Sequence, residues 1–370
     1  MDSSSSEVKI ISKCFVKPKT LPEKWKEPYH FSPMDHVMLS MHYIQKGLLF
    51  LKPSFSESGN AVTPKEFMDT LLQKLKDSLA TTIIHFYPLA GRLSTLKTDN
   101  PRFHSVFVDC NNSPGAGFIH AESDLSVSGI LGSKYVPLVV QSLFDHQKSL
   151  NRDGHTMSLL SVKVTELVDG VFIGLSMNHS IGDGSSFWHF FNSSSEIFNS
   201  QEETIDNNNN KLLCLKNPLI FGEVSGPIYS LPFSEPDKSI SRFETPVLNE
   251  RIFHFSSEKL RLLKSKANQE CGTTNISSFQ SLTAFIWRSI TRARKLPNDQ
   301  DTTCRLVDGT RSRTRMNPPL PNDYFGVYIS PVHTTTKTGN LLENEFGWAA
   351  LKLHQAVTEH NGEKISSEMN

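Results

Sequence analysis

The stretch Val171–Trp188 reads VFIGLSMNHSIGDGSSFW and joins a strand pattern to two ionisable residues. Apolar and small side chains alternate up to Asn178, and this period of two predicts a β-strand. One face of that strand would carry Val171, Ile173, Leu175 and Met177, and the other Phe172, Gly174 and Ser176. His179 follows directly, where a rigid element gives way to a loop, which is a common place for a reacting group.

A histidine at this place can act as a base, because an ordinary pKa of ~6.5 leaves much of the imidazole neutral near pH 7. Asp183 lies four residues further on, with Gly182 and Gly184 on either side. A helical turn would put both side chains on one face, so that Asp183 orients the imidazole. A bend at the glycines would instead turn Asp183 away, to hold the loop through an arginine. A purely structural, hydrogen-bonded histidine is the third alternative.

Four further motifs follow the same order as in a known family, and the resemblance covers nearly the whole chain. HSIGDG matches the HxxxDG signature of the plant BAHD acyltransferases, which transfer an acyl group from a coenzyme A thioester to an alcohol or amine. The resemblance implies that His179 is catalytic and that Asp183 belongs to the same site. The other motifs are SPMD (Ser32–Asp35), YPLAGR (Tyr87–Arg92), SSFQSLTAFIWR (Ser277–Arg288) and NPPLPNDYFG (Asn317–Gly326).

The resemblance implies an α/β protein with two similarly folded domains, each with a mixed sheet and flanking helices, as in chloramphenicol acetyltransferase. Composition places the boundary: residues 201–250 hold acidic residues, the run Asn207–Asn210 and several prolines, and bury little apolar surface. We therefore expect an N-terminal acyltransferase domain at 1–200, a crossover linker at 201–250 and a C-terminal domain at 251–370.

Local patterns predict the elements of both halves. Thr63, Pro64 and Glu66 form a capping box that opens a helix with Phe67, Leu71, Leu75 and Leu79 on one face. A hairpin turn is expected at Asp169–Gly170. The remaining expected elements are a strand-like run over 82–92 broken by Pro88 and Gly91, a strand over 158–167, a helix over 187–197, a strand over 251–255, a helix from 257 to near 272, and a helix over 279–290.

The coenzyme site is predicted in the second half. By the resemblance, Ser277 and Ser278 belong to the pantetheine channel. Asp308–Arg315, DGTRSRTR, is the densest basic stretch and replaces a shorter DGRxR of the family. Arginine forks bind phosphate well, so Asp308, Arg311 and Arg313 are candidate coenzyme A contacts, with a solvated loop as the alternative. Arg311 or Arg313 is also the expected partner of Asp183.

Overall composition indicates a protein that acts on small molecules. Lys plus Arg equals Asp plus Glu at 38 each, so no global field attracts nucleic acid or an anionic membrane. The five cysteines are scattered without a CxxC pair, which predicts free thiols and no metal site. No signal peptide or spanning segment is visible. We expect a cytoplasmic monomer that uses acyl-CoA and a small-molecule acceptor, with no permanently bound cofactor.

Two departures from the family pattern bear on activity. Val327 stands where the family's YFGN motif has an asparagine. The chain stops at Asn370 before the family's DFGWG motif, and Glu345–Trp348 is a false match because it leads into a helical pattern. The resemblance thus implies an incomplete second domain.

The leading hypothesis is an acyl-CoA-dependent transferase acting on a plant metabolite with His179 as general base. The alternatives are a truncated, non-catalytic scaffold or binding protein, and a lyase that uses the same histidine without coenzyme A.

Overall fold

The chain forms two compact units in the computed structural model. The first comprises Met1–Arg251 and Pro321–Tyr328, and the second Ile252–Leu320 and Ile329–Asn370. The domain boundaries drawn from the sequence stay a prediction, and most of the expected linker lies outside the described residues. No helix among those residues is long and apolar enough to cross a membrane. The structure describes residues 7–54, 63–99, 102–200, 246, 248–307, 313–315 and 319–362.

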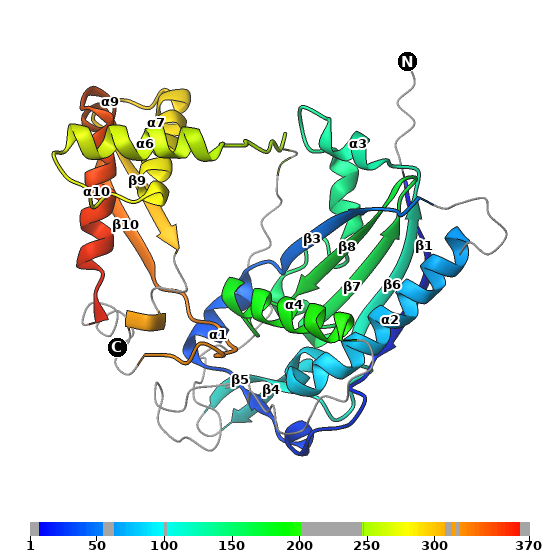
Figure 1. The fold of residues 1–370 in the computed structure, drawn as a ribbon. Helices are drawn as coiled ribbons and strands as arrows, with labels where there is room; N and C mark the ends of the chain where they lie inside the picture. Colours follow the sequence, from blue (N-terminus) through cyan, green and yellow to red (C-terminus); the bar gives the residue numbers. More distant parts are fainter. Residues whose placement is uncertain are drawn as a thin grey trace. The chain divides into compact units, whose positions relative to one another are not determined.

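A mixed five-stranded sheet organises the first unit (Figure 1), in the order β1-β6-β7-β8-β3. Only β6 and β7 are parallel; the other neighbours are antiparallel. A smaller antiparallel sheet has the order β2-β5-β4. The strands are β1 Val8–Val16, β2 Tyr29–His30, β3 Ile44–Leu51, β4 Arg92–Asp99, β5 Arg102–Asp109, β6 Ala116–Ser123, β7 Leu160–Glu166 and β8 Gly170–Met177.

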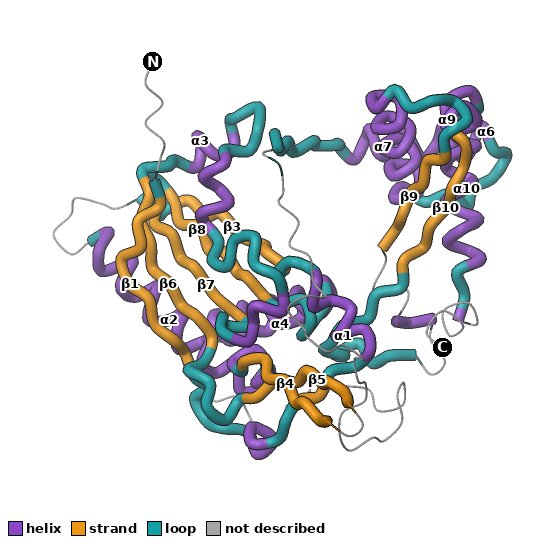
Figure 2. Tube along the Cα trace, turned by 180° about the vertical axis from the view of Figure 1, so that it is seen from behind, coloured by secondary structure: helices purple, strands orange, loops and turns teal. Residues whose placement is uncertain are grey.

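Helices α2 (Pro64–His85) and α4 (Gly184–Asn199) lie against one face of the large sheet (Figure 1). The core there joins Val171, Leu175 and Met177 of β8 to side chains of both helices, as the alternation along the strand predicts. Figure 2 shows the sheet from behind, where α3 (Val127–Leu131) and irregular segments lie. A short helix, α1 (Pro33–Val37), precedes β3.

The β7–β8 hairpin confirms the predicted antiparallel pair but shifts its turn by one residue. The Leu167 amide donates to the Gly170 carbonyl at 2.9 Å, so the turn residues are Val168 and Asp169. Gly170 is already in strand β8, and a side chain there would meet the Phe50 carbonyl of β3 at 2.5 Å. The glycine serves close strand packing rather than turn geometry.

Helix α2 confirms the capping box but not the strand-like run that was expected over 82–92. The helix continues to His85, and Tyr87–Ala90 form a 3₁₀ turn before β4 begins at Arg92. Leu79 and Ile83 are buried and continue the apolar face of the helix. β-branched residues such as Ile83 destabilise a helix by only about 0.5 kcal/mol each relative to alanine. The burial of these side chains contributes more than that penalty.

The second unit confirms the helices that its sequence predicts. Among the described residues, its core joins side chains of α6, α7, α9 and α10 to a two-stranded antiparallel sheet. Glu345–Trp348 begins a helix, as expected, and the Gly347 amide there donates to the Glu270 carboxylate at 2.5 Å. The elements are α6 Ser257–Glu270, α7 Ser278–Arg294, β9 Asp301–Val307, β10 Pro331–Lys337, α9 Thr338–Glu343 and α10 Phe346–Glu359.

The strand predicted over 251–255 is wrong. These residues have no regular structure, and Ile252 is 80% and Phe253 66% exposed. A strand needs a paired neighbour, and none of the described strands pairs with this segment.

The number of paired neighbours predicts that amide hydrogen exchange is faster in β9 and β10 than in β7 and β8. Within the described residues β9 and β10 pair only with each other, whereas β7 and β8 each have two neighbours. A two-stranded ribbon opens at a lower free energy than the middle of a five-stranded sheet. Exchange followed by mass spectrometry on peptides of 160–177 and 301–337 measures the difference. Equal protection would contradict the expectation.

Candidate functional site

The end of β8 presents His179 in a turn whose backbone is held from several sides. The Asn178 amide donates to the Leu159 carbonyl at 2.7 Å and extends the ladder by one residue. The His179 amide then donates to Oδ1 of Asn151 at 2.7 Å. The Asn178 Oδ1 accepts from the Ser180 amide at 3.0 Å. The turn that carries the candidate base is therefore fixed by side-chain amides as well as by the sheet.

The imidazole of His179 is partly buried, and burial lowers its pKa below the ordinary 6.5. Its own carbonyl, the Asp183 carboxylate and the Gly182 carbonyl act in the opposite direction with smaller effects. The ammonium of Lys46 lowers the pKa further. His179 Nδ1 is buried and makes no hydrogen bond to a described residue. The net shift of the pKa favours the neutral imidazole, the form that can accept a proton.

Lys46 is a cation near the site that the sequence analysis did not single out. Its Nζ lies 4.6 Å from the ring centroid of Trp188 and 5.2 Å from that of Phe187, both on α4. Lys46 of β3 lies opposite Leu175 of β8 in the sheet, and Leu175 is four residues before His179. Burial lowers the pKa of this lysine as well.

Asp183 caps α4 with its carboxylate. Oδ1 accepts from the amides of Ser185 and Ser186 at 3.0 Å each, and Oδ2 accepts from the Tyr328 amide at 3.0 Å. The carboxylate is almost fully buried, at 2% exposure. Charge-assisted bonds of this kind offset the cost of burying the charge. These bonds go to backbone amides, a partner that neither of the two alternatives named; the expected arginine partner stays a prediction.

The segment Pro321–Tyr328 brings a second motif against the HSIGDG turn. Ser186 Oγ donates to the Gly326 carbonyl at 2.8 Å, and the Asp183 amide donates to the same oxygen at 3.2 Å. Phe325 is buried in the core of the first unit. Val327, which replaces the family's asparagine, is also buried. Two motifs about 140 residues apart in sequence therefore form one hydrogen-bonded unit.

Close packing also explains Gly182. A side chain there would meet Cβ of Ser186 at 2.9 Å and approach the ring of Phe325 at 3.6 Å. Gly184, by contrast, has open space around it. Only the first of the two glycines beside Asp183 is required by the geometry of the turn.

The predicted coenzyme residues belong to the second unit or lie outside the described residues. Ser277 caps α7, with Oγ accepting from the Gln280 amide at 3.2 Å, and Ser278 is exposed. Arg313 is buried. Asp308 and Arg311 are outside the described residues, so the pairing of Asp183 with Arg311 or Arg313 stays a prediction.

Two other arginines of the second unit stabilise helix ends. Arg288 donates to the carbonyls of Leu341 and Asn344 at the end of α9, at 2.5 and 2.6 Å. Arg315 donates to the carbonyls of Val357 and His360 at the end of α10, at 2.9 and 2.8 Å. Cations there complement the helix dipole and satisfy terminal carbonyls.

The SPMD and YPLAGR motifs are likewise structural. Ser32 and Asp35 form a capping box, and Arg92 donates to the Gly91 and Gly115 carbonyls.

Asn151 cannot be recognised from the sequence, because nothing in the run NRDGH marks its side chain as a partner of His179. Only the approach of two chain segments 28 residues apart reveals it. No group of three or more His, Cys, Asp or Glu side chains suited to a metal ion occurs among the residues that the structure describes.

Comparison with known proteins shows the family to which the chain belongs. The model of the Transferase family matches residues 6–370. An uncharacterized acetyltransferase of Arabidopsis thaliana is 34% identical over 360 residues, which are 95% of this chain and 76% of that protein. The BAHD acyltransferase DCR of the same plant is 32% identical over 376 residues, 98% of this chain and 74% of that protein.

Solved structures share the fold at low identity. Vinorine synthase superposes with a TM-score of 0.66 at 21% identity, over 98% of this chain and 79% of that one. TRI101 of F. sporotrichioides, complexed with coenzyme A and T-2, gives a TM-score of 0.65 at 14% identity, over 92% and 76%. The predicted α/β class with mixed sheets is thereby confirmed. With its family model, its relatives and its fold in agreement, the chain belongs to the Transferase family of BAHD acyltransferases.

Proposed function

We propose that this protein transfers an acyl group from an acyl-coenzyme A to a hydroxyl or amine of a small plant metabolite, with His179 as general base. The observation that carries the proposal is a partly buried imidazole held at the end of strand β8, with its pKa lowered by burial. A shikimate O-hydroxycinnamoyltransferase of Nicotiana tabacum and an anthranilate N-benzoyltransferase of Dianthus caryophyllus are among its relatives, at 28% and 27% identity. Their names support both an oxygen and a nitrogen acceptor.

The chemistry needs one base and no covalent enzyme intermediate. The imidazole of His179 accepts the proton of the acceptor hydroxyl or amine while its oxygen or nitrogen attacks the thioester carbonyl. The tetrahedral oxyanion then collapses, the carbon–sulfur bond breaks, and the coenzyme leaves as a thiolate. The imidazolium returns its proton to that thiolate, which regenerates neutral His179. Acyl-CoA is thus a co-substrate, and no permanently bound cofactor is required.

For the coenzyme we propose contacts in the second unit. Ser277 and Ser278 at the start of α7 would line the pantetheine channel, and Asp308, Arg311 and Arg313 would hold the nucleotide end. The complex of coenzyme A with TRI101, a protein of the same fold, supports a coenzyme site. Arg288 and Arg315 each donate to the last carbonyls of a helix, so neither is proposed as a phosphate contact. Cytoplasmic location and a monomeric state remain predictions from the sequence.

Asp183, in this proposal, holds the turn rather than exchanging protons. Its carboxylate oxygens face three backbone amides of α4 and of the segment 321–328. The effect of Asp183 on the pKa of His179 is smaller than that of burial. Loss of its charge should therefore act first on stability.

Replacing the candidate base tests the function directly. His179→Ala should lower kcat by about 100-fold or more, as removal of a general base does, while the affinity for coenzyme A stays within a factor of about 2. Steady-state kinetics on a panel of acyl-CoA donors with phenolic, alcohol and amine acceptors, together with calorimetric titration of coenzyme A, give both values. Near-normal turnover in the variant would reject His179 as base. Turnover without coenzyme A would favour a lyase, and the absence of both binding and turnover a non-catalytic protein.

The pH dependence should have a distinctive acid limb. Because burial lowers the pKa of His179 below 6.5, kcat/KM should be level at pH 7 and fall only below about pH 6.5 as the imidazole becomes protonated. Lys46→Met removes a nearby positive charge that lowers this pKa, so the acid limb should move to higher pH. An acid limb that does not move in the variant would show that Lys46 leaves the base unaffected.

Asp183→Asn should destabilise the first unit. The amide group retains one acceptor oxygen but presents an NH₂ group toward amides that need an acceptor. An unsatisfied buried group costs on the order of 1–3 kcal/mol in the free energy of unfolding. Urea unfolding followed by tryptophan fluorescence measures this, with the exposed Asp77→Asn as a control that should change little. Lost activity at full stability would instead indicate that Asp183 takes part in the chemistry.

A further inference from the structure

Asn151 connects three chain segments around the candidate base. Its side chain is fully buried, and its Oδ1 accepts from the His179 amide at 2.7 Å. Its Nδ2 donates to the Met38 carbonyl at 2.8 Å and to the His42 carbonyl at 3.4 Å. Both sides of the side-chain amide are therefore used.

The backbone of Asn151 is held in the same way. Its amide donates to the Met41 carbonyl at 2.8 Å, and its carbonyl accepts from Nδ2 of Asn178 at 2.7 Å. Hydrogen bonds between Asn151 and the pair Asn178–His179 therefore fix the backbone of the turn. Since the side-chain direction of His179 follows from its backbone position, these bonds restrict where the imidazole can lie.

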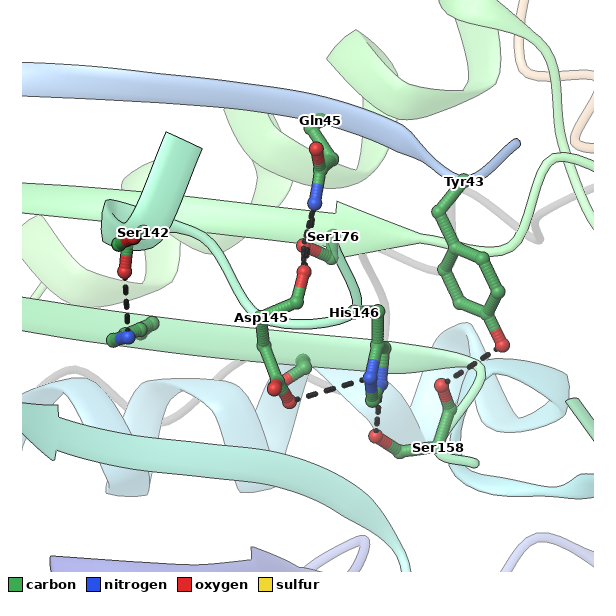
Figure 3. Close-up of polar contacts among 9 residues, drawn as sticks. Tyr43, Gln45, Ser142, Asp145, His146, Ser158 and Ser176 are labelled. Carbon is green, nitrogen blue, oxygen red and sulfur yellow. Dashed lines mark hydrogen bonds and ion pairs between the residues drawn. The ribbon is translucent and has the colours of Figure 1, made fainter. Parts of the chain in front are cut away.

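The segment that leads to Asn151 is itself anchored to the sheet (Figure 3). The Asp145 carbonyl accepts from Nε2 of Gln45 and from Oγ of Ser176, each at 2.7 Å. His146 has a φ of 56°, and its Nε2 lies 2.9 Å from Oγ of Ser158. A residue other than glycine keeps such a φ only where its surroundings impose it.

The same polar cluster involves the middle of the sheet. Oγ of Ser161 donates to the Asp145 carboxylate at 2.7 Å, and the ammonium of Lys163 donates to the Ser142 carbonyl at 2.7 Å. Ser161 and Lys163 of β7, like Ser176 of β8, lie on the sheet face opposite to the core that the helices cover. The strand that delivers His179 and the segment that carries Asn151 are therefore parts of one rigid polar layer.

From these contacts we infer that Asn151 is a positioning residue for the reaction: it fixes the backbone of His179 and through it the aim of the imidazole. This inference rests on the proposed function, in which His179 is the base. The side chain of Asn151 binds the backbone of His179, so its effect on the rate passes through His179. A misplacement of the base by about 1 Å can cost up to about 100-fold in rate, so the loss of this hydrogen bond has a measurable effect.

A double-mutant cycle on the full chain tests the inference, with an acyl-CoA and acceptor pair that the wild type turns over. Asn151→Ala should lower kcat by about 10-fold or more and leave KM for both substrates within about 3-fold. In a His179→Ala background the same substitution should change the residual rate by less than about 2-fold. Equal losses in both backgrounds would overturn the inference, because Asn151 would then act independently of His179.

A control variant separates positioning from general destabilisation. Asn268→Ala removes a side-chain amide that likewise bridges two segments, with bonds to Ile276 at 3.1 and 3.0 Å, in the second unit. Its kcat should fall less than that of Asn151→Ala at equal loss of thermal stability. A fall as large as that of Asn151→Ala would overturn the inference.

A conservative variant serves where Asn151→Ala does not fold. Asn151→Asp keeps an acceptor for the His179 amide and adds a negative charge beside the turn. It should regain most of kcat at high pH and raise the pKa of His179, which NMR titration of the imidazole reads without any substrate. An unchanged imidazole pKa would reject the positioning role. A raised pKa in a protein without transferase activity would reject only the proposed function.

Discussion

The carboxylate of Asp183 makes the interaction on which the arrangement of the candidate site depends. It accepts three backbone hydrogen bonds, two from the first turn of α4 and one from Tyr328, 145 residues away in sequence. A buried negative charge is tolerated in a protein interior only when such donors compensate it. The strand-to-helix turn, the start of α4 and the returning segment Pro321–Tyr328 are therefore fixed together, with His179 between β8 and this anchor.

The large sheet divides its two faces between stability and positioning. On one face, apolar side chains of β7 and β8 pack against α2 and α4, which supplies the hydrophobic core of the first unit. On the other, Ser161, Lys163 and Ser176 bind the segment that leads to Asn151. Because β8 belongs to both layers, a change of packing on either face would move the same turn. His179 is thus held by directional hydrogen bonds upstream and by the Asp183 anchor downstream.

Basic residues of the second unit show why charge density alone does not locate a phosphate site. Arg288 and Arg315 come from regions rich in cations, yet each donates to the last carbonyls of a helix. These bonds satisfy groups that an α-helix leaves open at its end, so the two guanidinium groups serve the packing of α9 and α10. Residues 251–255 likewise show that local sequence is not enough. Their composition favours a strand, but they form none, because none of the described strands pairs with them.

The sequence by itself determined the elements whose pattern is local. The alternation of β8, the capping box at Thr63 and the helices α4, α6 and α7 were predictable, because side-chain period and capping act over a few residues. The HSIGDG motif also placed His179 at the end of a strand. Tertiary structure alone decided the length of α2, where burial outweighs propensity, and the direction of the Asp183 carboxylate, which also accepts from an amide 145 residues away in sequence. It likewise decided the role of Asn151, since a hydrogen bond between segments distant in sequence leaves no periodic trace in either of them.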